Sequence, residues 1–146
     1  MSGTQQPEDL PVAEALRLLG DVRFGRVVFT SRALPAVRPV RHVVGDGTIV
    51  ISAGPEVALS TESVESARGG GTIVAYEADQ LDSSGCSGWT VVVIGRATPV
   101  TDAAEIGRYR RLLPPASEAD QLITISADVV NGFRTAGAVR PARARG

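Results

Sequence analysis

The chain is short of the residue types that most often build a reactive or metal-binding centre. It has 146 residues but only one Cys and one His, so it can form neither an internal disulfide nor a cluster of His and Cys metal ligands. It contains no Lys, because all 15 of its basic residues are Arg. A Schiff-base lysine and a lysine clamp on phosphate are therefore both excluded.

Strong net charge and long apolar runs are also missing. The net charge of −1 gives no general attraction to nucleic acid or to an anionic membrane. No apolar run reaches the length of a membrane span, and the polar N-terminus lacks the pattern of a secretory signal. We therefore expect a cytoplasmic protein with no nucleic-acid or membrane partner. Aromatic residues make up only 4% of the chain, so aliphatic side chains must fill its core.

What the sequence does contain is a succession of short β-forming segments. Gly45-Asp46-Gly47 indicates a hairpin, and Pro39 places part of its strand at an edge or a bulge. The apolar centre of segment 89–100, VVVI, predicts a central strand buried on both faces, and Gly95 predicts a bend in it. The strands expected from the whole pattern are 24–30, 36–44, 48–52, 71–79, 89–100, 121–126 and 130–135.

The sequence predicts two helices. A third segment has two alternatives, a short helix or an irregular crossover. Apolar residues between Pro11 and Gly20 recur at helical spacing. Asp102 and Glu105 form a variant of the capping box before a helix over 103–113. Residues 56–67 are either a short helix or an irregular crossover.

The connections between strands are mostly too short for parallel crossovers. We therefore expect a mainly β fold, an antiparallel barrel of six to seven strands with two to three helices packed outside it. This domain should span residues 10–135, between a disordered lead (1–9) and a disordered tail (136–146).

Five segments in this order resemble the pyridoxamine 5′-phosphate oxidase-like superfamily, in particular its small actinobacterial flavin-binding members. The resemblance covers about residues 10–133 and implies a split β-barrel homodimer with FMN at the dimer interface, related to flavin-dependent oxidoreductases. Some relatives use a deazaflavin or haem instead. The alternative is a non-catalytic barrel that binds another small molecule, haem or a protein partner. The segments are GRVVFT, LPAVRPVRHVV, GDGTIVIS, GTIVAYEADQLD and GWTVVVIGRATPVTD.

The resemblance also implies which residues hold the cofactor. Arg38 and Arg41 have guanidinium groups that can pair with a phosphate or a flavin carbonyl, although arginines are also common on exposed edge strands. Trp89 would lie close to the partner subunit's flavin, or would pack at the dimer contact. The full set implied for the cofactor is Arg38, Pro39, Val40, Arg41, Ser52, Ala53 and Trp89.

The corner that usually holds the phosphate is altered. Relatives read like FRTGPGSKL where this chain reads ISAGPEVAL, and Glu56 adds a negative charge. Arg38 and Arg41 would then have to supply the positive charge, or the ligand lacks a phosphate there, or cofactor binding has been lost. The relatives' Arg, Thr, Ser and Lys fall on Ser52, Ala53, Val57 and Ala58.

For a few further residues the sequence allows either a functional or a purely structural role. His42 is a candidate proton donor or axial ligand, or a barrel-wall residue whose ring is satisfied. Cys86 lies in a polar loop with nothing nearby to lower its pKa. Glu77, Asp79 and Asp82 suggest divalent-metal ligands, but a solvated outer face explains them better, so we expect no metal site. The C-terminal arginines, Arg134, Arg140, Arg143 and Arg145, fit a solvated tail, with nucleic-acid contact as the alternative.

Overall fold

The strands follow one another as antiparallel neighbours, as the short turns between them require. The computed structural model describes residues 8–57, 71–83 and 87–135. All seven predicted strands and the two described helices end within two residues of their expected positions. The elements are β1 (Glu8–Asp9), α1 (Val12–Asp21), β2 (Phe24–Ser31), β3 (Leu34–Gly45), β4 (Thr48–Ala53), β5 (Thr72–Leu81), β6 (Gly88–Pro99), α3 (Ala103–Leu112), β7 (Gln121–Ser126) and β8 (Val129–Thr135).

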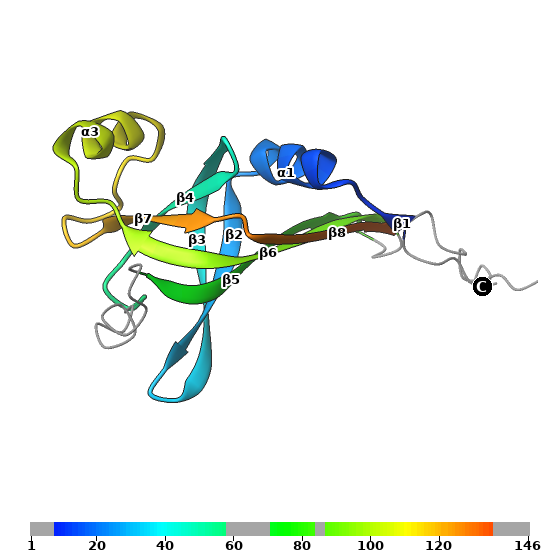
Figure 1. Cartoon of the computed structure of the whole chain (residues 1–146), viewed down its shortest axis with the longest axis horizontal. Helices are drawn as coiled ribbons and strands as arrows, with labels where there is room; N and C mark the ends of the chain where they lie inside the picture. Colours follow the sequence, from blue (N-terminus) through cyan, green and yellow to red (C-terminus); the bar gives the residue numbers. More distant parts are fainter. Residues whose placement is uncertain (1–7, 58–70, 84–86, 136–146) are drawn as a thin grey trace, which may run out of the picture.

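Six strands close into a barrel in the order β6-β5-β2-β3-β4-β7, with β7 returning to β6 (Figure 1). The predicted split barrel is therefore confirmed. Strand β8 extends the sheet beyond β6, and β1 pairs with β8. This short β1 is formed by Glu8 and Asp9, which the sequence placed in the disordered lead, and it raises the number of described strands to eight.

Strand β6 belongs to two parts of the sheet, and Gly95 is the point where it passes from one to the other. It pairs with β8 as far as Ile94 and with β7 from Ala97 onward. A Cβ atom on Gly95 would collide with the backbone carbonyl oxygen of Ser126. Gly95, where the sequence predicted a bend, is thus the point where β6 changes partner, and the missing side chain lets β7 close the barrel.

The hairpin turn and the helix cap that the sequence predicts are both present in the structure. Asp46 and Gly47 both have positive φ, as a two-residue hairpin turn requires. The Asp102 side chain accepts a hydrogen bond from the Glu105 N–H at 3.0 Å, which caps α3 as predicted. Most of the segment 56–67, the third helix considered, lies outside the described residues.

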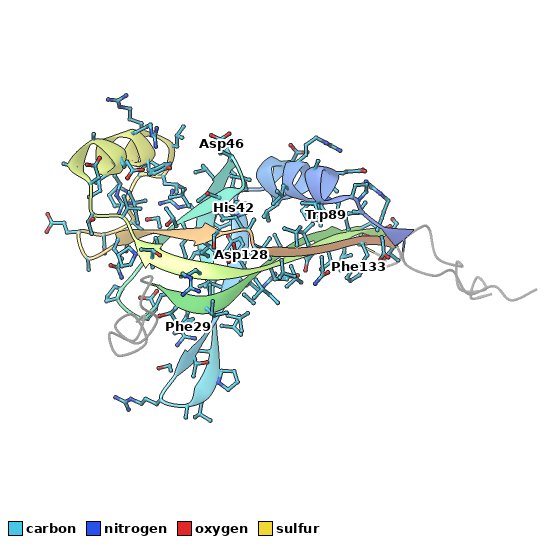
Figure 2. All side chains as sticks on the ribbon, viewed as in Figure 1. Phe29, His42, Asp46, Trp89, Asp128 and Phe133 are labelled. Atoms are coloured by element: carbon cyan, nitrogen blue, oxygen red, sulfur yellow. The ribbon has the colours of Figure 1, made fainter. Side chains whose placement is uncertain are left out.

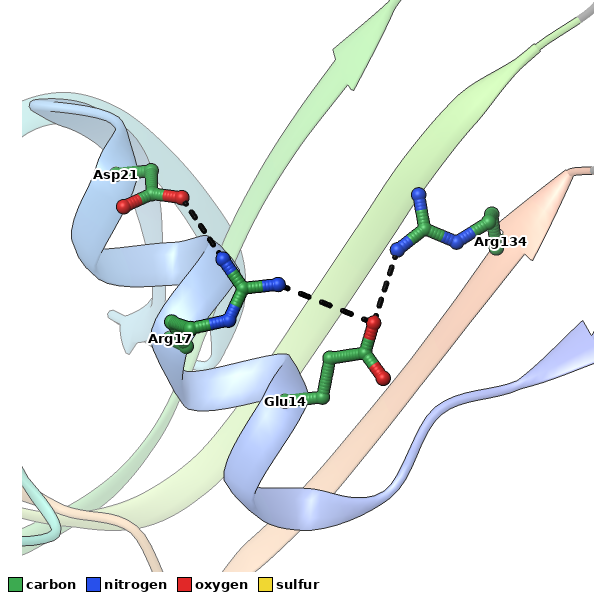
Figure 3. A network of polar contacts seen from close by, with 4 residues as sticks. All are labelled: Glu14, Arg17, Asp21 and Arg134. Atoms are coloured by element: carbon green, nitrogen blue, oxygen red, sulfur yellow. Dashed lines mark hydrogen bonds and ion pairs between the residues drawn. The ribbon is translucent and has the colours of Figure 1, made fainter.

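Helix α1 packs its apolar face onto the barrel, where Leu18 and Leu19 join the main core. Its polar face carries a charged network (Figure 3): Glu14 accepts from Arg134 of β8 at 3.1 Å, and Arg17 lies between Glu14 and Asp21. Arg134 is therefore part of a strand and a tie to α1, and its assignment to the solvated tail was wrong.

Helix α3 covers the outer face of β4 and β7. Val50 and Leu122 form a second small core there with Leu113, just after the helix. Strand β4 is consequently buried on both faces, inward against the barrel core and outward under α3. Neither of the described helices is long and apolar enough to cross a membrane.

The outer face of the sheet away from α3 carries a row of apolar residues and is uncovered in the described chain. Val91 and Val93 of β6 are fully buried in the barrel, but Ile94, on the other face, is 38% exposed. The prediction that this strand is buried on both faces is therefore wrong for a single chain. Strand register aligns five apolar residues across this face, here called the outer row: Val37, Val28, Ala75, Ile94 and Val129.

Candidate functional site

The strand that the sequence assigned to the cofactor has an open edge. Strand β3 pairs with β4 only over residues 41–45, so among the described strands its residues 34–40 are paired with β2 alone. Alternation of the ladder from the Ser31–Leu34 pair directs the backbone groups of residues 35, 37 and 39 away from β2. Since Pro35 and Pro39 have no N–H, Val37 offers the single N–H donor on this edge. The prediction that Pro39 lies at an edge is confirmed.

A hollow of about 200 Å³ adjoins this edge on the outer face, lined by Phe24, Gly25, Arg26, Pro39 and Asp79. Arg26 is already neutralised there, because its guanidinium lies 2.9 Å from Glu77 and 3.8 Å from Asp79. Burial raises the pKa of Glu77, with the neighbouring Asp79 adding to the effect. In the described ranges no three His, Cys, Asp or Glu side chains gather as a metal site.

Arg41 and Ser52 form a cross-strand pair on the outer face, on the far side of Phe24 from the rest of the hollow's lining. Phe24 of β2 is the partner of Arg41 on its other side, so all three side chains share the outer face. The Arg41 guanidinium donates to the carbonyl oxygen of Pro114, in the segment after α3. The Ser52 hydroxyl accepts a hydrogen bond from Arg110 at 2.8 Å.

Arg110 is a residue that the sequence analysis missed. It lies in the last turn of α3, and its guanidinium also donates to the Leu113 carbonyl at 3.1 Å and the Asp120 carbonyl at 3.0 Å. A basic residue is ordinary at the end of a helix. Nothing local in the sequence therefore indicated that this one reaches β4, 58 positions earlier in the chain.

Arg38 and Arg41, predicted to act together, are separated. Three positions apart on one strand, they lie on opposite faces of β3. Arg38 is exposed on the hairpin that projects beyond the barrel in Figure 1, and it donates to the carbonyl oxygen of Val37 at 2.7 Å. Only Arg41 shares a face with the hollow.

Three of the predicted cofactor residues face the core. Val40 and Ala53 are buried with the main core cluster, and the Trp89 indole is 4% exposed within the same cluster. Figure 2 shows Trp89 beside α1. Packing inside its own subunit is thus the role that the described contacts give to Trp89.

The corner at residues 54–57 is filled rather than open. Val57 is fully buried in the main core, and its N–H donates to the Gly54 carbonyl at 3.0 Å. The Glu56 carboxylate lies against Gly54, where a Cβ would collide with it. An apolar side chain and a carboxylate therefore occupy the corner that the family resemblance assigned to the phosphate, while Ala58 lies outside the described residues.

His42 is a satisfied barrel residue and not an open ligand. It is 2% exposed. Its Nε2–H donates to the Leu19 carbonyl at 2.8 Å, so Nδ1 of the neutral ring accepts from the Tyr76 hydroxyl at 2.5 Å. Burial lowers the pKa of His42 and raises that of Tyr76. The proton-donor and axial-ligand readings are wrong, because both ring nitrogens are engaged. Cys86 and the arginines after Arg134 lie outside the described residues.

Known proteins resemble the chain in sequence and in fold. An uncharacterized protein of Mycobacterium tuberculosis, Rv0080, is 46% identical over 123 residues, which is 83% of this chain and 80% of that protein. The FAD binding protein from Mycobacterium smegmatis is 24% identical, with a TM-score of 0.64 over 90% of this chain and 98% of its own. The FAD and haem binding protein from the same organism is 15% identical, with a TM-score of 0.66 over 90% and 75%.

Those two structures establish the fold alone, since their sequence identities are low. The family rests on sequence, because residues 11–132 match the family described as pyridoxamine 5′-phosphate oxidase. The match spans the whole barrel, from α1 into β8. The chain therefore belongs to the pyridoxamine 5′-phosphate oxidase family.

Proposed function

We propose that this chain is a flavin-binding, oxidoreductase-type protein that works as a homodimer, with the flavin held against the outer face at the hollow beside β3. Family membership supports a flavin, as do the solved relatives described as FAD-binding. A bound flavin supplies the hydride chemistry, and the protein contributes position, electrostatics and exclusion of water.

The observation that carries this proposal is the hollow itself. It combines an aromatic side chain, Phe24, with Pro39 and the open backbone edge of β3. Its volume of about 200 Å³ falls below the roughly 300–1,000 Å³ of typical small-molecule sites. We infer that a second copy over the outer face deepens the hollow into a cofactor site shared between subunits.

The outer row supports the homodimer. It is an apolar strip across five strands, and a two-fold interface requires a patch that complements itself. An apolar strip meets this condition, and the Arg26–Glu77 pair beside it offers both charges for reciprocal contacts. The second copy is therefore the occupant that we propose for this face.

On this site the described residues have separate tasks. Phe24 and Pro39 form an apolar surface for a ring system. The Val37 N–H is placed to bind a ring carbonyl, as a strand edge binds an added partner. Arg41, next to the hollow, supplies positive charge toward a phosphate or an electron-rich ring.

One observation favours a second function, a non-catalytic barrel. Val57 fills the corner at 54–57, and the Glu56 carboxylate would repel a phosphate. A ligand without a phosphate at that point, or a protein partner, is compatible with such a corner. Haem binding through His42 is not, because its ring nitrogens are engaged inside the barrel.

Titration of the purified protein with FMN, FAD and a deazaflavin, followed by flavin fluorescence, tests the proposal. We expect saturable binding of at least one of them, with one site per chain. Phe24→Ala should weaken that binding by about tenfold through loss of ring contact. Leu112→Ala, which also removes an exposed apolar side chain but on α3, should leave it unchanged. A protein that retains none of the three cofactors would rule out the flavin and leave the non-catalytic barrel.

A further inference from the structure

Two arginines meet the segment after α3 without a carboxylate partner. Arg41 donates to the carbonyl oxygen of Pro114, and Arg110 donates to Ser52 Oγ and to the carbonyl oxygens of Leu113 and Asp120. In the described part of the chain neither forms an ion pair within 4.0 Å. Arg41 and Arg110 are each only partly exposed, and the donors of a guanidinium bond most strongly to an anionic acceptor.

The hydrogen-bonding capacity of Arg110 is not used up. A guanidinium has five N–H donors, and the three contacts of Arg110 use Nη1 twice and Nη2 once. The Nε–H and one Nη2–H remain, and both donors on such a group favour an anionic acceptor. Asp120 does not fill this role, because its carboxylate is held by the Ala116 and Ser117 N–H groups, which lower its pKa more than Arg110 does.

The position of this pair connects it to the hollow. Phe24, Arg41 and Ser52 are successive cross-strand partners on the outer face, and Phe24 also lines the hollow. Neighbours of this kind have Cβ atoms about 5 Å apart. A ligand with its ring in the hollow therefore needs to extend by only one strand to reach Arg41, and by a second to reach Ser52 and Arg110.

We propose that Arg41 and Arg110 form an anion site above Ser52 that binds the phosphate of the cofactor, in place of the corner at 54–57. The proposal rests on the flavin function proposed above and assigns the phosphate to residues from α3 and β3. Of the other arginines near the hollow, Arg26 is already paired with Glu77, and Arg38 lies on the opposite face of β3.

FMN and riboflavin, which share a ring and differ by the phosphate, separate this role from a structural one. The Kd of each is measured by flavin fluorescence for wild type and for Arg110→Gln. We expect the Kd for FMN to rise at least tenfold, from the loss of a charged hydrogen bond, while the Kd for riboflavin stays within about twofold. If Arg110 only holds α3 in place, both Kd values would rise together.

Two further variants serve as a control and as a rescue for Arg110→Gln. Arg111→Gln removes the same charge from the same helical turn but at an exposed position, and it should change neither Kd. Ser52→Arg in the Arg110→Gln background places a guanidinium on β4, near the position that Arg110 occupies in wild type, and should recover part of the FMN affinity.

Thermal unfolding in inorganic phosphate, against chloride at equal ionic strength, tests the anion site without any flavin. Phosphate should raise the Tm of wild type and of Arg111→Gln but not of Arg110→Gln. If wild type binds no flavin yet shows this Arg110-dependent stabilisation, the proposed function fails and the anion site stands. Equal FMN affinity in wild type and Arg110→Gln, with phosphate stabilisation unchanged, would overturn the site.

Discussion

At the residue scale, one buried polar pair links two strands of the barrel to helix α1. His42 of β3 bridges the Leu19 carbonyl of α1 and the Tyr76 hydroxyl of β5, and both rings are almost fully buried. Gly25 of β2 leaves the room for the Tyr76 ring, because a Cβ there would lie 2.5 Å from the ring's Cζ. Each group satisfies the others, so the pair is stable only while His42 is neutral.

This geometry predicts acid sensitivity. Burial lowers the pKa of His42 below its ordinary value of 6.5, so between the two pKa values the unfolded chain binds a proton that the folded chain does not. The free energy of unfolding should fall as pH is lowered from about 6.5, with a limiting slope of about 1.4 kcal/mol per pH unit. Urea unfolding of wild type between pH 8 and pH 5 measures this slope.

The control for this slope is His42→Gln, which cannot titrate. Glu77, whose pKa is raised, acts with the opposite sign but is shared by both proteins, so it cancels in the comparison. The variant should be less stable at pH 8 and should lose less stability than wild type between pH 6.5 and pH 5. Equal slopes in the two proteins would mean that His42 does not control the acid response.

At the element scale, β6 closes the barrel only because it has a glycine where it changes partner. In Gly95→Ala the new Cβ would push against the Ser126 carbonyl, which is backbone and cannot swing aside. The β6–β7 pairing must then shift, and we expect a loss of about 3 kcal/mol, typical of overpacking with backbone movement. The midpoint of urea unfolding should fall accordingly.

A glycine-to-alanine substitution at Gly45 is the matched control, because nothing surrounds the position of the new Cβ. Gly45, at the end of β3, has no heavy atom within 4 Å of the place that a Cβ would occupy. Gly45→Ala should therefore alter the midpoint very little. A Gly95→Ala protein as stable as Gly45→Ala would show that β7 can close the barrel without this close approach.

At the scale of the whole molecule, the exposed outer row predicts the oligomeric state. Ile94 lies at the centre of β6, and Val129 beside it is 48% exposed. Light scattering of wild type at micromolar concentration should give twice the chain mass of 15.2 kDa. In Ile94→Glu a charge would be buried at the contact, so the variant should dissociate to monomers at the same concentration.

Leu112→Glu is the matched control, since it places the same charge at an exposed apolar position on α3. It should remain dimeric. A monomeric wild type would remove the proposed dimer, and a dimeric Ile94→Glu would move the contact away from the outer row. Far-UV circular dichroism should show that both variants keep the fold of wild type.

The sequence by itself determined the strands, the two described helices and their antiparallel order. Period-two alternation, the Asp46-Gly47 turn and the Asp102 cap act over a few residues, so they can be read locally. The family resemblance in the sequence also predicted a cofactor at β3 and drew attention to the altered corner, and both stay predictions. A special role for Gly95 could be predicted because a glycine in a long apolar strand has few other uses.

Only the tertiary structure decided which side chains meet. Strand alternation placed Arg38 and Arg41 on opposite faces, but no local pattern showed which face adjoins the hollow. Trp89 packs in the hydrophobic core of its own subunit, because α1 and β6 together bury its side chain. Arg110 reached Ser52 because α3 lies over β4, and helix packing on a sheet depends on the apolar surface of the whole barrel. Contacts between distant segments are set by that global packing, and for this reason the sequence pattern did not indicate the proposed anion site.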